Sequence, residues 1–411
     1  MEQLLISLDA GFDGFKMIVG PEKTTTYRIP SQIIDISNRE GEIDARLKEN
    51  SFIVEMEDNA SKTMKAKFYS IGETALTMST IDDATMQLIN SSTDSFYKEN
   101  LERFSSSELF KTMVLSHIGY AILKQKEQGC KITSNTEIIV GIALPDEINK
   151  NKETTKNLRD SLYGKHKLSI RANSKSKEFE TVEFELKKGS LVTQSQVLAV
   201  IFSNFISEDG DFDEEALKEF LPAIVYDGGY TTDGLAFIDE LIKVQKSESK
   251  TDYSMKSTNT ATYRNIMDKL ENYQHDDLKE YMIEDLAFHN KSRRYYHKDE
   301  TKNDFVLIDF SAEQQPVLED MAIKKAEYLI KNYKMNEVEN LFVAGGAGER
   351  SFEYFKNAIN KRRSHVNVTI IKPTLENEEL SPVFSIAAGL YKQLLNQFLK
   401  EWFRWTDFIS I

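Results

Sequence analysis

The chain has 411 residues and a formal net charge of −14, a length that favours two or more domains with separate cores. Hydrophobic residues make up 40% and charged residues 29%, and no apolar run is long enough to predict a membrane span or a signal peptide. The negative charge argues against direct binding of nucleic acid by the whole surface, and the single cysteine, Cys130, favours a reducing, cytoplasmic compartment.

The first predicted elements form a hairpin near the N-terminus. Residues 4–19 read LLISLDAGFDGFKMIV, an apolar run, a Gly-rich turn and a second apolar run that opens with Lys16. Glycine lets backbone amides approach phosphate oxygens, and a carboxylate at a strand end, here Asp9, suits Mg²⁺. Lys16 would bring a compact positive charge to phosphates. Because Asp-Gly turns are common, an ordinary hairpin with a solvated aspartate remains the alternative for this segment alone.

The middle of the chain predicts alternating strands and helices. Apolar runs that end at glycine or proline predict strands at 26–31, 66–71 and 137–145, and further short strands are predicted at 51–54 and 191–194. Apolar residues at helical spacing predict a helix over 106–126, and a second helix is predicted to run through Ile206.

A second hairpin of the same design follows. Residues 223–237 read AIVYDGGYTTDGLAF, a strand, an acidic Gly-rich turn and another strand, with Asp227 in the place that Asp9 takes in the first hairpin. Two such turns in one chain indicate a phosphate site more strongly than either turn alone. Asp227 is accordingly predicted to serve Mg²⁺ as Asp9 does.

The last third begins with a polar segment and ends with glycines and helices. Residues 243–303 are predicted to form a small outer subdomain, and 316–333 a helix with Pro316 in its first turn. Residues 340–348 read NLFVAGGAG, a strand that runs into glycines, and a final long helix is predicted to start near Phe384.

Further short motifs make the order of these elements specific. They are IPS at 29–31, YSIGETA at 69–75, VGIALP at 140–145 and PVFSIAAGL at 382–390. With the two hairpins and the late glycines, this ordered set resembles the ParM-type, plasmid-segregating actin-like ATPases of the actin, DnaK and sugar-kinase superfamily. The resemblance covers nearly the whole chain, except the polar segment and the last residues.

The resemblance implies an actin-like ATPase fold. Two ribonuclease-H-like α/β domains with mixed sheets would flank a nucleotide cleft. Domain I would comprise 1–202 and be completed by 373–411, with an outer subdomain at about 30–101. Domain II would comprise 203–372, with an outer subdomain at about 243–303.

The resemblance also implies a site for ATP, or GTP, with Mg²⁺, and attack of water on the γ-phosphate. Asp9 and Asp227 would hold Mg²⁺ through water, and Gln194 would orient the attacking water, with Gln196 as an equally reachable candidate. The residues implied to bind the nucleotide are Asp9, Gly11, Asp13, Gly14, Phe15, Lys16, Gly228, Gly229, Tyr230, Thr231, Thr232, Gly345, Gly346, Ala347 and Gly348.

The second hairpin departs from the resemblance at one position. The family pattern D-x-G-x-x-T-x-D fits Asp227, Gly229 and Thr232, but Gly234 stands where the final Asp belongs, and Asp233 comes one residue early. Because side chains alternate along a strand, Asp233 is expected to point to the opposite face of the sheet.

The implied function is a nucleotide-dependent filament of identical subunits that segregates plasmid or other extrachromosomal DNA. It would act through a DNA-binding adaptor at a centromere-like site, without contacting nucleic acid directly. A membrane-associated, FtsA-like scaffold is an alternative, because apolar residues dominate 394–411, although the few basic residues there argue against membrane binding. A small-molecule kinase of the same fold is a further alternative.

Overall fold

The chain divides into two compact units in the computed structural model, and each is described by itself. Unit 1 comprises 1–214 and 372–411, and unit 2 comprises 215–371. The structure describes residues 3–11, 14–38, 47–57, 66–75, 107–172, 177–229, 233–250, 252, 254–269, 283, 294–299 and 304–399. The domain limits predicted from the sequence stay a prediction.

The central sheet of unit 1 is mixed, with the order β10-β7-β1-β2-β3. Its strands are β1 (Gln3–Ala10), β2 (Phe15–Gly20), β3 (Thr25–Ile29), β7 (Glu137–Leu144) and β10 (Leu191–Ser195). The first three strands form an antiparallel meander, whereas β7 runs parallel to both β1 and β10. The predicted first hairpin is confirmed, with Asp9 opposite Lys16.

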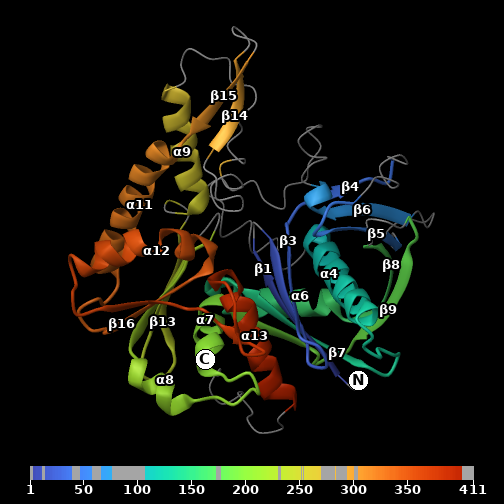
Figure 1. Cartoon of the computed structure of the whole chain (residues 1–411). Coiled ribbons are helices and arrows are strands. Elements are labelled where there is room, and N and C mark those ends of the chain that lie inside the picture. The colour runs from blue at the N-terminus through green and yellow to red at the C-terminus, as the bar shows by residue number, and fades with distance from the viewer. Residues whose placement is uncertain are drawn as a thin grey trace. The chain divides into compact units, whose positions relative to one another are not determined.

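Helices cover both faces of this sheet, which explains why β1 is buried at almost every position. Leu4, Ile6 and Leu8 lie in one core with α4 (Glu108–Glu127), whereas Leu5 lies in another with α13 (Ser385–Leu394) (Figure 1). Asp9 shares the face of Leu5, because side chains alternate along the strand. The remaining helices of this unit are α5 (Asp146–Asn149), α6 (Lys152–Leu162) and α7 (Gln196–Phe205).

The close crossing of α13 and α7 depends on a glycine. A Cβ at Gly389 would overlap the carbonyl oxygen of Ala199. The chain then leaves α13 through a π-helical turn, Leu395–Leu399. The predicted last helix is confirmed, preceded by the 3-10 turn Pro382–Phe384. Among the described helices, none is long and apolar enough to cross a membrane.

A second sheet in unit 1 has the order β4-β6-β5-β8-β9. Its strands are β4 (Ile33–Asp35), β5 (Ser51–Glu57), β6 (Ala66–Gly72), β8 (Gly164–Arg171) and β9 (Glu180–Leu186). Since β8 and β9 follow α6, this sheet draws on a part of the chain beyond the predicted outer subdomain at 30–101.

The sheet of unit 2 repeats the strand order and directions of the central sheet of unit 1. Its order is β13-β12-β11-β16-β17, again an antiparallel meander beside parallel strands. The strands are β11 (Ala223–Asp227), β12 (Asp233–Ile238), β13 (Val244–Lys250), β16 (Asn340–Ala344) and β17 (Asn367–Ile370). Two mixed sheets of one topology confirm the predicted pair of ribonuclease-H-like cores.

Two long helices cover one face of the sheet of unit 2. Ile224 and Tyr226 of β11 share a core with α11 (Ser311–Asn332) and α12 (Gly345–Asn360). The prediction that a helix starts at Pro316 was wrong: the amides of Glu313 and Gln314 bond to the carbonyl of Phe310, so α11 begins five residues earlier and contains the proline. The other elements of unit 2 are α8 (Glu214–Phe220), α9 (Met255–Lys269) and the hairpin of β14 (Arg294–Asp299) with β15 (Asp304–Asp309). The short hairpin of β18 (Thr374–Leu375) with β19 (Glu378–Glu379) belongs to unit 1.

Candidate functional site

The first turn follows β1 and holds a buried ion pair. Lys16 Nζ lies 3.7 Å from Asp9 Oδ2, and both side chains are almost fully buried. Gln196, the first residue of α7, donates its Nε2 to Asp9 Oδ1 at 3.3 Å. The carboxylate of Asp9 therefore has a cation on one side and an amide on the other.

Neighbouring residues fix the backbone of this turn. The hydroxyl of Ser31, from the IPS motif, donates to the carbonyl of Gly11 at 2.5 Å. A Cβ at Gly14 would come within 3.0 Å of the Ile29 carbonyl oxygen, so this position favours glycine. Phe12 and the predicted site residue Asp13 lie outside the described residues.

Phe15, also predicted as a site residue, anchors the hairpin to α4. Its ring stacks on the imidazole of His117, with centroids 4.1 Å apart and planes at 14°. His117 is completely buried, and its Nδ1 donates a hydrogen bond to the carbonyl oxygen of Met113 at 2.7 Å. Burial lowers the pKa of His117 to about 4, so the ring is neutral at pH 7.

The side-chain amide of Gln194 bonds to groups other than Asp9. Its Nε2 donates to Gln393 Oε1 at 3.0 Å, and its Oε1 accepts the amide of Ser195 at 2.8 Å. Both ends of this buried amide are thus committed to α13 and to the local backbone. Of the two glutamines that the sequence offers, Gln196 is the one beside the carboxylate.

The second turn follows β11 and is joined to the late glycines. The amide of Gly228 donates to the carbonyl of Ala344 at 2.9 Å, and the amide of Ala347 donates back to the carbonyl of Gly228 at 3.0 Å. A Cβ at Gly228 would overlap the backbone nitrogen of Gly348. The sequence-predicted glycines of the two segments therefore lie in direct contact.

Asp227 lies beside the N-terminus of α12. It is 9% exposed, and a Cβ at Gly345 would come within 2.5 Å of its Oδ1. Gly345 also has a φ of +76°, a left-handed conformation that favours glycine. Gly346 follows it in the first turn of α12. Tyr230, Thr231 and Thr232 lie outside the described residues.

Asp233 points to the face opposite Asp227, as the alternation predicted. Asp227 pairs with Gly234 in the sheet, so these two share one face. The carboxylate of Asp233 instead lies with Tyr226, on the face covered by α11, and is buried. Its Oδ2 is 3.2 Å from Lys325 Nζ.

Each turn, taken by itself, has residues that fit a phosphate with Mg²⁺. This ion is held in proteins by one or two carboxylates and completes its shell with phosphate oxygens and water. Asp9 and Asp227 each present one carboxylate at the end of a strand, next to glycines. Among the described residues, no group of three or more His, Cys, Asp or Glu side chains could hold a metal ion.

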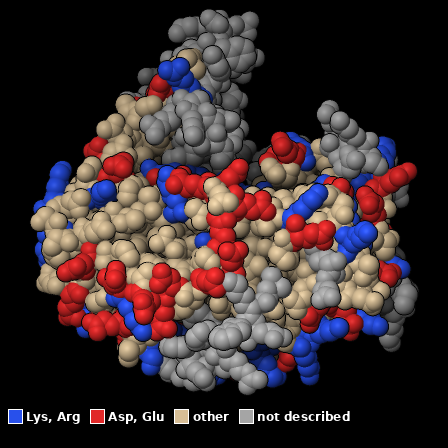
Figure 2. Space-filling view, turned by 60° about the horizontal axis from the view of Figure 1, so that its bottom comes forward, with Lys and Arg blue, Asp and Glu red and all other residues tan. Residues whose placement is uncertain are grey.

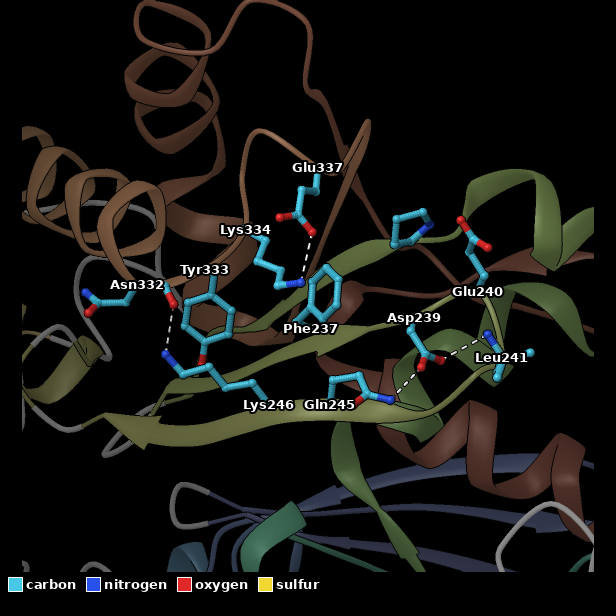
Figure 3. Close-up of a pocket in the computed structure, with 11 residues that line it drawn as sticks. Phe237, Asp239, Glu240, Leu241, Gln245, Lys246, Asn332, Tyr333, Lys334 and Glu337 are labelled. Carbon is cyan, nitrogen blue, oxygen red and sulfur yellow. Dashed lines mark hydrogen bonds and ion pairs between the residues drawn. The ribbon is translucent and has the colours of Figure 1, made fainter.

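A separate pocket of about 810 Å³ opens at the other end of β12. It is lined by Asp239, Glu240 and Gln245, together with Lys246, Tyr333 and Lys334 (Figure 3). Gln245 donates to Asp239, Lys246 donates to the carbonyl of Asn332, and Lys334 forms an ion pair with Glu337. Asp233 starts β12 and Asp239 follows its last residue, so the strand separates this pocket from the turn. It therefore forms no part of the phosphate turn.

Comparison with known proteins identifies the fold. No protein-family model matches the chain, and no relative was found among curated protein sequences. Among solved structures, ParM from a 15-stranded Clostridium botulinum filament matches with a TM-score of 0.67 and 15% identity over 97% of this chain and 100% of that chain. The actin-like protein Alp7A matches with a TM-score of 0.69 and 13% identity over 97% of each chain. Bacillus thuringiensis ParM with ATP matches with a TM-score of 0.58 and 14% identity, over 97% of this chain and 100% of that chain.

These matches confirm the predicted fold class. They extend over nearly the entire chain, and they include both units. At 13–15% identity the likeness concerns the fold. The chain has the actin-like fold, and its structure resembles those of ParM and Alp7A.

Proposed function

We propose that this protein binds and hydrolyses a nucleoside triphosphate and assembles with copies of itself into filaments. The observation that carries the proposal is the repeated turn. Asp9 is the next-to-last residue of β1 and Asp227 the last residue of β11, equivalent strands of two sheets with one topology, and a Gly-rich turn follows each strand. Two solved relatives of the same fold add support, since one is ParM in a filament and another is ParM with ATP.

In this proposal each turn contributes to phosphate binding. Lys16 would donate to phosphate oxygens instead of Asp9, so that the carboxylate of Asp9 becomes available to Mg²⁺. The glycine amides in the first turn of α12 would contribute further donors, since a helix N-terminus favours anions. When bound, Mg²⁺ would neutralise charge on the phosphates. Whether ATP or GTP is preferred is left to the experiment.

We propose Gln196, rather than Gln194, as the residue that orients the attacking water. An amide can both donate to water and accept from it, and the Gln196 amide already lies against Asp9. The Gln194 amide is occupied at both ends by Gln393 and Ser195. The family resemblance implied Gln194, with Gln196 as an equally reachable candidate.

For the cellular role, we propose that the filament segregates plasmid or other extrachromosomal DNA in the cytoplasm through a DNA-binding adaptor. The net charge of −14 supports an adaptor over direct DNA contact, because phosphates attract basic surfaces. On the face shown in Figure 2, Asp and Glu gather in groups, and Lys and Arg form no wide patch. A basic adaptor surface fits this charge.

The proposal is tested by recording light scattering and phosphate release together after Mg²⁺ and ATP, or GTP, are added. Scattering that rises above a critical concentration, with phosphate release that follows it, is the expected result. Phosphate release without scattering would refute the filament and favour a kinase or a monomeric switch. Absence of both would refute nucleotide-driven assembly.

The two glutamines provide a matched pair of variants. Gln196→Ala is expected to lower the hydrolysis rate per bound nucleotide by about a hundredfold. Gln194→Ala is expected to lower stability through the lost contact with Gln393, with a much smaller effect on that rate. A larger rate loss in Gln194→Ala would return the role to Gln194.

A further inference from the structure

Asp233 holds a buried cluster of polar groups behind the second turn. Its Oδ2 lies 3.2 Å from Lys325 Nζ and accepts the hydroxyl proton of Tyr226 at 3.3 Å. Its Oδ1 accepts the amide proton of Gly229 at 3.2 Å. Lys325 Nζ also donates to the hydroxyl oxygen of Tyr226 at 2.5 Å. Each polar atom of this cluster therefore contacts a complementary one.

The cluster is costly to bury. Asp233 is 1% exposed and Lys325 5% exposed, and removing two charges from water costs several kcal/mol per ion before their attraction offsets it. Burial raises the pKa of Asp233 to about 6, while Lys325 and its hydrogen-bond donors act in the opposite direction. Packed apolar residues could fill this space with equal stability, so stability alone gives no reason for the pair.

What the pair does hold is the peptide backbone of Gly229. The Gly229 amide is bonded to Asp233, and its carbonyl accepts the amide of Met255, the first residue of α9, at 3.3 Å. The preceding peptide, at Gly228, is bonded to the start of α12. The backbone at Gly228 and Gly229 is thus held by Asp233, by the amide of Met255 and by the start of α12.

We propose that Asp233, held in place by Lys325 and Tyr226, is a positioning residue for the second phosphate turn. It fixes the orientation of the Gly229 peptide before a nucleotide arrives, so that binding does not have to order the turn. This inference rests on the proposed function, because it concerns the affinity for phosphates. It also assigns a role to the aspartate that stands one residue early in the sequence.

The test separates the hydrogen bond to Gly229 from the charge of the pair. Asp233→Asn with Lys325→Met removes both charges and keeps an oxygen that can accept the Gly229 amide. Asp233→Ala with Lys325→Met removes the charges and the acceptor. Dissociation constants are measured for the nucleoside triphosphate with Mg²⁺ and for the phosphate-free nucleoside, with circular dichroism to confirm folding.

The expected results differ between the two double variants. The Asn variant should bind the triphosphate within about threefold of the wild type, and the Ala variant about tenfold more weakly. Affinity for the nucleoside should be the same in both, which a general loss of folded structure would not produce. The exposed pair Asp320 and Lys324, also on α11 and 2.7 Å apart, provides the control: Asp320→Asn with Lys324→Met should change neither constant.

Each other outcome is decisive. Equal triphosphate affinity in the two double variants, whether like the wild type or weaker, would overturn the positioning role. A parallel loss of nucleoside affinity in the Ala variant would assign Asp233 to folding alone and overturn it as well. A wild-type protein that binds no nucleotide would refute the proposed function itself, and the positioning role with it.

Discussion

The buried imidazole of His117 should make unit 1 sensitive to acid. His117 stacks on Phe15, meets Phe52 edge-on at a centroid distance of 5.5 Å, and its Nε2 has no partner among the described residues. Protonation would place a charge in this apolar surrounding. The pKa of His117 is accordingly lowered from 6.5 to about 4 in the folded protein.

The sign and size of the effect follow from this difference. Between pH 6.5 and 4 the unfolded chain binds a proton that the folded protein does not, so the stability contributed above pH 6.5 is lost as the pH falls. One pKa unit corresponds to about 1.4 kcal/mol, so the whole displacement amounts to about 3 kcal/mol, of which about 2 kcal/mol is lost between pH 7 and pH 5.

The assay is urea unfolding followed by circular dichroism at pH 7 and pH 5, for the wild type and for His117→Gln. The free energy of unfolding of the wild type should fall by about 2 kcal/mol more than that of the variant, since glutamine does not titrate. Nuclear magnetic resonance of the His117 ring should give a pKa near 4. A ring that titrates near 6.5, or equal pH dependence in the two proteins, would refute the reasoning.

Three further substitutions test the packing of α13 against α7 and the packing and charge of the two turns. Gly389→Ala should lower the stability of unit 1 by about 3 kcal/mol, measured by thermal unfolding, because its Cβ would overlap the Ala199 carbonyl; an unchanged midpoint would contradict this. Gly228→Ala should lower stability by about 2 kcal/mol and weaken triphosphate binding, because its Cβ would overlap the Gly348 backbone; unaltered binding would show that this contact is dispensable. Lys16→Met should weaken triphosphate binding about tenfold relative to nucleoside binding, and an equal change for both ligands would remove Lys16 from phosphate recognition.

Local patterns in the sequence predict the two hairpins correctly. Apolar runs broken by Asp-Gly and Gly-Gly define β1–β2 and β11–β12, because strand alternation and turn chemistry act over a few residues. The same alternation predicts that Asp233 leaves the face of Asp227. That result depends on counting residues and on nothing distant in the chain.

Contacts between distant segments could not be predicted in this way. Lys325 lies almost a hundred residues from its partner Asp233, and Asp9 almost two hundred from Gln196. Either glutamine of the segment at 194–196 could have reached the first turn, and the bond to Gln393, about two hundred residues away, is what occupies the Gln194 amide. His117 gave no sequence signal, since a lone histidine on an apolar helix resembles any other core residue.

The start of α11 shows a limit of a different kind. Proline is most frequent in the first turn of a helix, so Pro316 predicts that α11 begins there. In the structure the first turn closes on Phe310, and the proline lies within the helix. The preference of proline for the first turn is outweighed here by the hydrogen bonds of Glu313 and Gln314 to Phe310, which start the helix earlier.

The central claim is that nucleotide phosphates engage both hairpin turns. Hydrogen exchange with mass spectrometry tests it most directly, by comparing peptides over 8–18 and 226–235 with and without Mg²⁺ and nucleoside triphosphate, in protein kept below its assembly concentration. Slower exchange in both peptides, and no change in a peptide over the pocket at 239–246, is the predicted result. Unchanged exchange in both turns at a saturating nucleotide concentration would contradict the account.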